Sequence, residues 1–177
     1  EKLCYYTLNS IFGYEPKIAT ALISSLGSAR AVFDLSPQEQ EQILGPYSKF
    51  KGKICKAALE ESDKELCRLK EKGIRFIGRN EKNFPELLKE CEDCPSGLYI
   101  RSASDIIFDS NKVYISIVGT RDLSHYGREW CERIVESLSL CKEKPVIISG
   151  LAIGADICAH LTALNCGLET IAILPCG

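Results

Sequence analysis

Hydrophobic residues in the first third of the chain recur at the spacing of amphipathic helices. One series lies within residues 18–26 and another within residues 54–59, with apolar side chains three or four positions apart. Glycine and proline separate the two series, and Ser36 before Pro37 is typical of a capped helix start. We therefore expect residues 1–68 to form a small module of short helices joined by tight turns.

Beyond residue 68 the pattern changes to short apolar runs separated by polar turns. Residues 74–77 and 98–100 predict short strands, residues 84–88 predict a short helix or turn, and the β-branched run at 113–118 predicts a strand covered on both faces. The elements predicted next are a helix at 126–141, a strand at 146–148, a helix at 155–165 and a strand at 170–174.

The helix predicted at residues 126–141 should bury one stripe of apolar side chains. Trp130, Ile134, Leu138 and Cys141 lie three or four positions apart, so we expect them to form that stripe.

Alternating strands and helices over residues 113–174 indicate βαβ units in a parallel sheet with flanking helices, which is an α/β fold. Gly167 suits the left-handed position that commonly ends a helix. We expect two domains, residues 1–68 and 69–177. The chain ends directly after a predicted strand, so we expect the second domain to be truncated at its C-terminal end.

Composition narrows the classes of function. The net charge of −2 does not favour binding of nucleic acid through overall charge, so any anion site should be local. No apolar run approaches the ~20 residues of a membrane span, and no signal-peptide pattern opens the chain. We expect a cytoplasmic protein with reduced thiols. Four of its 10 cysteines lie in apolar periodic stretches, as small buried hydrophobes would: Cys131, Cys141, Cys158 and Cys166.

A metal site has little support in the sequence. Cys91 and Cys94 have the spacing of a zinc knuckle, but a structural zinc site needs four ligands. No second pair of cysteines has this spacing, and His125 and His160 lie far away in the sequence. We expect neither a metal nor a cofactor.

Two loops at predicted strand ends could hold an anion. Their small and polar residues are Gly119, Thr120, Arg121, Ser149, Gly150 and Gly154. Ligands of open α/β sheets bind beyond the carboxyl ends of strands, arginine forms bidentate bonds with phosphate, and free N–H groups at a helix start favour an anion. If the two strands are neighbours, both loops face one crevice. A structural alternative stays open, in which the glycines permit tight turns and Asp156 complements the helix dipole.

No catalytic signature stands out. The GxGxxG fingerprint fits poorly, the P-loop pattern is absent, and no Ser-His-Asp arrangement is evident. His160 lies within a predicted helix, where a satisfied side chain is the simpler interpretation. We assign no catalytic residue.

The helical module holds two weaker candidates. Residues 48–56 contain four lysines around Phe50, which could be a basic patch or a solvated helix end. Residues 13–19 resemble the hairpin of a helix-hairpin-helix element, which binds backbone phosphate, but Glu15 replaces the usual second glycine. That replacement favours a structural role.

Taken in order, several stretches resemble the DNA-processing protein A (DprA, or Smf) family. The matching stretches are residues 26–29, 84–88, 98–101, 116–121, Tyr126–Gly127, the run 148–160 that includes Asp156 and His160, and 170–177. Each stretch is weak alone, whereas the ordered set is specific and covers nearly the whole chain.

The resemblance implies a Rossmann-like core, preceded by a helical module similar to SAM and helix-hairpin-helix domains. It implies binding of single-stranded DNA without a cofactor, loading of the RecA recombinase in natural transformation and recombination, and a homodimer in the full-length protein. A single-strand-binding protein is a further candidate partner. The DNA phosphate would contact the six loop residues named above, supported by Tyr126, Gly127, Asp156 and His160.

Three departures and two rival functions accompany this resemblance. Ile153 stands where the family often has arginine, Ser102 replaces a usual glycine, and the chain ends about halfway through the family's core.

The main rival is a nucleotide-processing enzyme similar to nucleoside-monophosphate phosphoribohydrolases, with Asp156 as its only clear acid. The other is a scaffold whose loops bind nothing.

Overall fold

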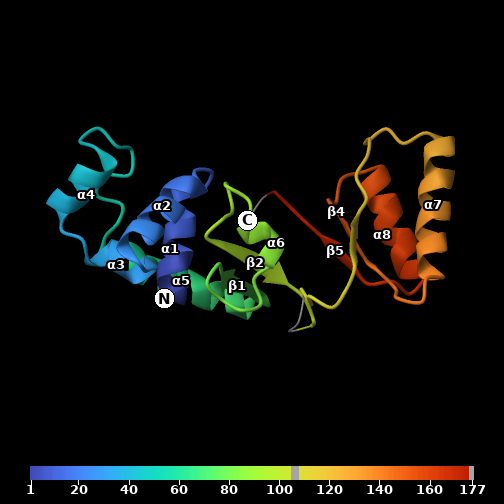
Figure 1. Ribbon diagram of the computed structural model, residues 1–177, viewed down its shortest axis with the longest axis horizontal. Helices are drawn as coiled ribbons and strands as arrows, with labels where there is room; N and C mark the ends of the chain where they lie inside the picture. Colours follow the sequence, from blue (N-terminus) through green and yellow to red (C-terminus); the bar gives the residue numbers. More distant parts are fainter. Residues whose placement is uncertain (105–107, 176–177) are drawn as a thin grey trace. The chain divides into compact units, whose positions relative to one another are not determined.

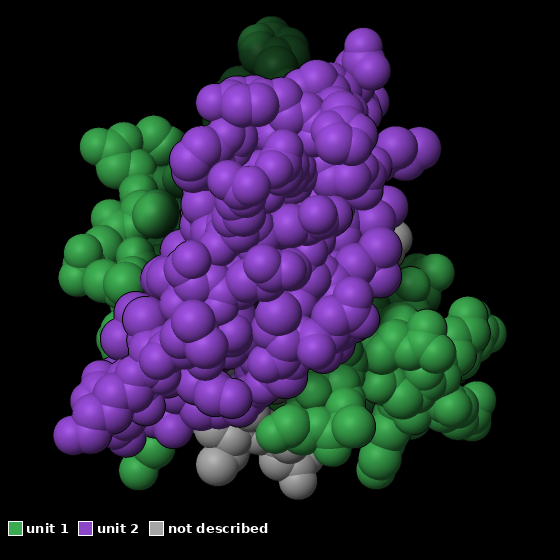
Figure 2. Space-filling model, turned by 90° about the vertical axis from the view of Figure 1, so that its right-hand side faces the viewer, with its two compact units in different colours: residues 1–108 green, residues 109–177 purple. Residues whose placement is uncertain are grey.

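The structure of the protein is a computed structural model that describes residues 1–104 and 108–175. The chain forms two compact units, Glu1–Phe108 and Asp109–Gly177 (Figures 1 and 2). This division lies later than the domain boundary expected between residues 68 and 69, because the first two strands pack with the helices that precede them. Within the described residues, no helix is both long and apolar enough to cross a membrane.

The first unit begins with helices, as the apolar spacing predicted. They are α1 (Lys2–Phe12), α2 (Pro16–Leu26), α3 (Ala29–Asp34), α4 (Pro37–Leu44) and α5 (Lys56–Glu71). The Ser36 hydroxyl accepts the N–H of Glu39, and the Glu39 carboxylate accepts the N–H of Ser36. This capping box satisfies two N–H groups at the start of α4 and confirms the predicted helix start.

A two-stranded sheet completes the first unit. Strand β1 (Ile74–Gly78) pairs antiparallel with β2 (Gly97–Arg101), and the short helix α6 (Glu86–Lys89) lies between them in sequence. The Phe76 ring packs edge-on against Tyr6 of α1, with centroids 5.1 Å apart. A side chain at Gly97 would place its Cβ 2.0 Å from the Phe76 ring, so only glycine fits there.

The second unit contains the predicted parallel sheet. Strands β3 (Tyr114–Ser116), β4 (Val146–Ser149) and β5 (Thr170–Ala172) pair in that order, and helices α7 (His125–Ser139) and α8 (Ala155–Asn165) lie side by side on one face (Figure 1). Val135, Ile147 and Ala159 form the centre of the core between helices and sheet. Gly167 follows α8 with φ +68°, as predicted.

The prediction that the run at 113–118 is covered on both faces is wrong for the second unit. Ile115 and Ile117 pack into the core beneath the helices, but Val113 and Val118 are 49% and 78% exposed. The physical reason is that α7 and α8 both cover the same face of the sheet (Figure 1).

The predicted buried stripe of α7 is also largely wrong. Leu138 packs against the core, but Trp130, Ile134 and Cys141 are exposed, whereas Cys131 and Val135 are buried. The buried series starts one residue later than predicted, which rotates the helix by about 100°. Both series have helical spacing, and contact with α8 determines which one is buried.

Candidate functional site

The loops after β3 and β4 lie together at one edge of the parallel sheet (Figure 1). Ser116 and Ile148 are partners in the sheet, so both loops start at the same level. The N–H of Ala155, at the start of α8, donates to the carbonyl of Thr120 across the two loops at 3.1 Å. The structure therefore brings together the two stretches that the sequence singled out.

Three glycines allow the two loops to pack closely. At Gly154 the backbone has φ +101°, and a Cβ would lie 2.3 Å from the carbonyl oxygen of Thr120. A Cβ at Gly119 would lie 2.6 Å from the Ala155 Cβ, and one at Gly150 would lie 2.5 Å from Asp156 Oδ2. These glycines are required by loop packing whether or not a ligand binds.

Several backbone N–H groups at this edge have no acceptor. Throughout the described part of the chain, none of the following residues donates its N–H to a carbonyl or side chain: Gly119, Thr120, Arg121, Leu151, Ala152, Ile153 and Gly154. Four of these groups immediately precede α8, whose N-terminus carries partial positive charge. Unused N–H groups at a helix N-terminus form an arrangement that suits an anion.

Among the predicted polar side chains of the loops, only Arg121 is free. It is exposed and forms no ion pair or hydrogen bond with any described residue. The Thr120 hydroxyl accepts the N–H of Asp122 at 3.1 Å and stabilises its own loop. The Ser149 hydroxyl is buried and donates to the Ile117 carbonyl at 2.5 Å, so it joins β4 to the residue after β3.

The His160 side chain of α8 stabilises the loop that follows β4. Its Nε2 lies 2.6 Å from the carbonyl oxygen of Gly150 and must donate, because a carbonyl only accepts. Its Nδ1 lies 2.6 Å from the Thr170 hydroxyl, which also lies 2.9 Å from the Ile147 carbonyl. The imidazole therefore links α8, β5 and the end of β4, which is a supporting role.

Asp156 lies on the other side of Gly150. Its side chain is nine-tenths buried, and one carboxylate oxygen packs directly against the glycine. Within the residues that the structure describes, this carboxylate forms no hydrogen bond or ion pair. Its burial next to the loop was not evident from the sequence, where it resembled an ordinary acid in the first turn of a helix.

Tyr126 and Gly127 lie in the first turn of α7, at the same edge. The Ser124 hydroxyl caps this helix by accepting the Gly127 N–H at 3.1 Å. Tyr126 is 69% exposed, and its ring meets the ring of Trp130 edge-on. The sequence did not reveal Trp130 as a surface residue.

The basic segment of the first unit is partly neutralised, because two of its four lysines form ion pairs. Lys49 forms an ion pair with Glu15, and Lys51 pairs with Glu41 at 3.1 Å. Phe50 is buried in the core, with Lys49 and Lys53 against its ring. Glu15 belongs to the predicted hairpin between α1 and α2, so both weaker candidates contact each other within the fold.

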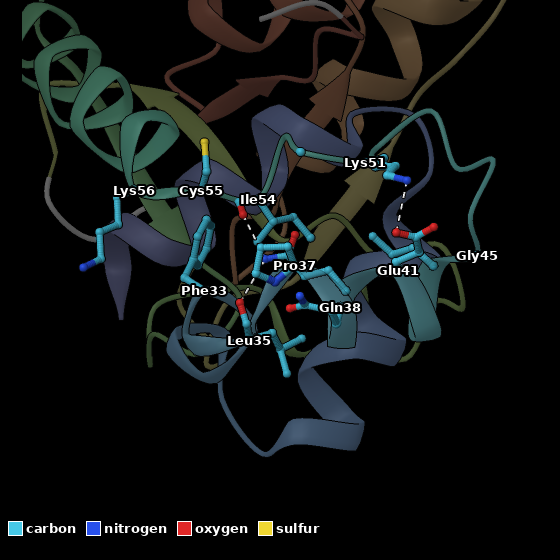
Figure 3. A pocket seen from close by; sticks show the side chains of 13 residues that line it. Phe33, Leu35, Pro37, Gln38, Glu41, Gly45, Lys51, Ile54, Cys55 and Lys56 are labelled. Carbon is cyan, nitrogen blue, oxygen red and sulfur yellow. Dashed lines mark hydrogen bonds and ion pairs between the residues drawn. The ribbon is translucent and has the colours of Figure 1, made fainter.

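A cavity of about 510 Å³ lies beside α4 in the first unit (Figure 3). Apolar side chains such as Leu35 and Ile54 line it, and the Gln40 amide donates to the carbonyls of both. None of the predicted loop residues of the second unit lines it, whereas Lys51, Ile54 and Lys56 of the basic segment do.

The cysteines show no ligand arrangement. Among the described residues, no three His, Cys, Asp or Glu side chains gather as metal ligands would. Cys91 is exposed and Cys94 is buried. Of the four cysteines expected in apolar stretches, Cys131 and Cys158 are buried and Cys166 is half-buried, while Cys141 is exposed.

The protein is similar to known proteins in both sequence and structure. A model of the DNA recombination-mediator protein A family matches residues 75–177. DNA processing protein DprA of Bacillus subtilis is 30% identical over 112 residues, which cover 63% of this chain and 36% of the relative. Protein Smf of Borreliella burgdorferi is 35% identical over 118 residues, which cover 66% and 35%. An X-ray structure of DNA processing protein A (DprA) from Streptococcus pneumoniae matches with a TM-score of 0.68 and 22% identity, over 97% of this chain and 57% of that one.

These comparisons confirm the predicted α/β fold and the resemblance noted in the sequence. The chain spans about a third of the length of the curated relatives it matches. Cys176 and Gly177, which took part in the resemblance, lie outside the described residues. Because the family model matches more than half of the chain, the protein belongs to the DNA recombination-mediator protein A family.

Proposed function

We propose that this protein binds single-stranded DNA at the edge of the sheet where the loops after β3 and β4 meet. One observation carries the proposal: two facing loops present unused N–H groups, and one of these loops carries an arginine that no described residue pairs with. A backbone phosphate there would accept bonds from the N–H groups before α8 and from the Arg121 guanidinium.

Family membership supports DNA as the ligand. Relatives from Bacillus subtilis and Streptococcus pneumoniae are named DNA processing proteins. For the whole protein we propose the family's role, which is to load the RecA recombinase onto single-stranded DNA in natural transformation and recombination. A homodimer, a single-strand-binding protein as a partner and a cytoplasmic location belong to the same proposal.

The local charge explains how a protein with a net charge of −2 could hold a polyanion. Arg121 supplies a permanent positive charge, and the N-terminus of α8 supplies a partial one. Hydrogen bonds to a charged group contribute about 1.5–3 kcal/mol each, so a single arginine-phosphate contact would matter. Ile153 is 75% exposed in the loop, and it offers no second cation.

A nucleotide-processing enzyme is the alternative, and Asp156 is the observation that favours it. Asp156 is nine-tenths buried as a residue, but its carboxylate bonds to no described residue and keeps contact with solvent, so it could take part in glycosidic chemistry at the same edge. Such chemistry generally uses two carboxyl groups. This alternative predicts that the protein consumes free nucleoside monophosphates and that Asp156→Asn abolishes the reaction, which product analysis by chromatography would detect.

The test is fluorescence anisotropy of a labelled single-stranded oligonucleotide across a salt series. We expect affinity to fall log-linearly with salt, and Arg121→Ala to weaken binding by about 10-fold or more and to make the salt slope shallower by about one ion. Lys51→Ala is the matched control, because it removes an exposed cation that Glu41 already neutralises. Equal effects of both variants, or no binding by the folded protein at low salt, would contradict the proposal.

A further inference from the structure

One face of α7 presents apolar side chains to solvent near the two loops. Tyr126, Trp130 and Ile134 lie four residues apart along it, and they are 69%, 45% and 51% exposed. The helix buries Cys131 and Val135 instead. Figure 2 looks onto the side of the second unit on which α7 lies. Tyr126 and Trp130 form an aromatic pair on this face.

The two rings of the aromatic pair are held in place by their neighbours. Their centroids are 6.1 Å apart with an angle of 66° between the ring planes. The Arg133 guanidinium lies 5.6 Å from the centre of the Trp130 ring, and Glu129 holds Arg133 through an ion pair of 2.6 Å. The rings are therefore ordered before any ligand arrives, which reduces the entropy lost on binding.

The aromatic pair lies next to the proposed phosphate site. Tyr126 is in the first turn of α7, and five chain steps separate it from Arg121. Their Cα atoms can therefore be at most about 18 Å apart. Trp130 follows roughly one helical turn further from the edge of the sheet. A strand whose phosphate lies at the loops could thus pass its neighbouring bases over both rings.

We propose that Tyr126 and Trp130 stack on the unpaired bases of the DNA strand whose phosphates lie at the loops. This inference rests on the proposed function and adds the residues that receive the bases. Every base has a π-face, so aromatic side chains bind bases without regard to sequence. The arginine against Trp130 adds a second planar group of the kind that nucleobases also stack on.

The charges around the aromatic pair favour a nucleic acid over a second protein chain. Arg121 is exposed shortly before the start of α7 and forms no ion pair with a described residue, whereas Arg128 lies on the side of the helix opposite the aromatic pair. The nearest acid on this face, Glu129, is already paired with Arg133. An unpaired arginine five residues before two exposed rings matches a strand that carries both phosphates and bases.

Other exposed aromatic residues lack this setting and provide controls. Tyr14 and Tyr47 of the first unit are 95% and 98% exposed. In the described residues, neither ring contacts another aromatic ring or a cation. Substituting them should leave DNA binding unchanged.

Trp130 is the only tryptophan in the chain, so the intrinsic fluorescence of the protein reports on this residue. The experiment titrates the protein with an oligothymidylate and, separately, with an abasic oligomer that has the same number of phosphates. We expect the oligothymidylate to quench Trp130 with the same midpoint as the anisotropy change. The abasic oligomer should bind at low salt, more weakly, and leave the emission unchanged.

Variants test the same inference through affinity. Trp130→Ala should weaken oligothymidylate binding by about 5-fold or more, while Trp130→Phe should keep most of the affinity. The affinity of Trp130→Ala for the abasic oligomer should match that of the unmodified protein, and Tyr14→Ala should change neither. Because Trp130 is half exposed, circular dichroism should show both variants folded.

Three outcomes would overturn the inference. Oligothymidylate binding that leaves Trp130 emission and Trp130→Ala affinity unchanged would overturn it, while the proposed function would stand. Equal quenching by the abasic oligomer would show that the rings sense phosphate binding alone. A change in emission with protein concentration in the absence of DNA would identify the aromatic pair as a contact between copies. If the folded protein shows no binding of the oligonucleotide in the anisotropy assay, the proposed function is overturned instead.

Discussion

The basic segment of the first unit (residues 48–56) and the loop edge of the second unit (the loops after β3 and β4) differ in whether their cationic side chains form ion pairs within the fold. Lys49 and Lys51 form ion pairs with Glu15 and Glu41. Arg121 pairs with nothing among the described residues and belongs to a loop with unused N–H groups. Ion pairs therefore engage two of the four lysines in the basic segment, whereas the one arginine of the loop edge stays unpaired within the described residues.

This difference shows that a count of charges along the sequence is a poor guide to an anion site. Exposed ion pairs add little stability, but they neutralise the lysines that a ligand would otherwise meet. A few backbone N–H groups held by close loop packing can offer a better site, although they carry no sequence signature of charge.

The largest effect on the loop edge should come from Gly154→Ala. Its backbone conformation is unfavourable for other residues, and the added Cβ would collide with the Thr120 carbonyl. We expect a loss of about 3 kcal/mol or more in the free energy of unfolding. Gly167→Ala is the matched control, because Gly167 has a positive φ but open space around it, and it should cost only about 1 kcal/mol. Denaturant unfolding measures both, and equal losses would show that the loops are not tightly packed.

The second-largest effect on the loop edge should come from His160→Ala. Removing the imidazole leaves the Gly150 carbonyl without the donor that holds the second loop. We expect a loss of about 1–3 kcal/mol in unfolding free energy and weaker DNA binding. Thr170→Val removes the hydroxyl from the other side of the ring and should reduce stability with a smaller change in binding. If His160→Ala is destabilised but binds DNA normally, the imidazole does not position the loop.

A smaller effect concerns the pH dependence of stability in the second unit. Burial, and then the hydrogen bond with Cys158, raises the pKa of the Cys131 thiol from its ordinary value of 9.0 to about 11. The folded state therefore favours the protonated thiol. Its contribution to stability is complete below pH 9 and is lost as the pH rises toward 11.

Unfolding at pH 8 and pH 10.5 tests this dependence. We expect the unmodified protein to lose more stability between the two values than Cys131→Ala does. Cys141→Ala is the control, because Cys141 is exposed. Identical pH dependence in all three proteins would contradict the assignment.

The smallest effect should come from the basic segment. Lys49→Ala and Lys51→Ala each break an exposed ion pair, so we expect losses of roughly 1 kcal/mol or less in unfolding free energy. DNA affinity should change less than about 2-fold, since neither lysine is free to meet a phosphate. A drop in anisotropy-measured affinity as large as that of Arg121→Ala would reverse the comparison between the two units.

Local signals made much of the fold predictable. The Ser36 capping box, the left-handed Gly167 and the alternation of strands and helices follow from interactions between residues close in sequence. The meeting of the two loops was predicted on the condition that their strands are neighbours, and the pairing of β3 with β4 meets that condition.

The rest depended on contacts between distant residues. Two apolar series run along α7, and only its packing against α8 decides that Val135 is buried and Trp130 exposed. The pairing of Lys49 with Glu15 joins residues far apart in sequence, as does the bond from Ser149 to Ile117. Whether a polar side chain is free or already engaged is therefore not visible in the sequence.

The most direct test of the central claim is an amide NMR titration of the protein with a single-stranded oligonucleotide. We predict saturable shifts in the resonances of residues 119–121 and 151–154, with the resonances of residues 48–56 unchanged. Shifts confined to residues 48–56, or none at the loops when the oligonucleotide is bound, would contradict the proposal that DNA phosphate lies at the loop edge of the second unit.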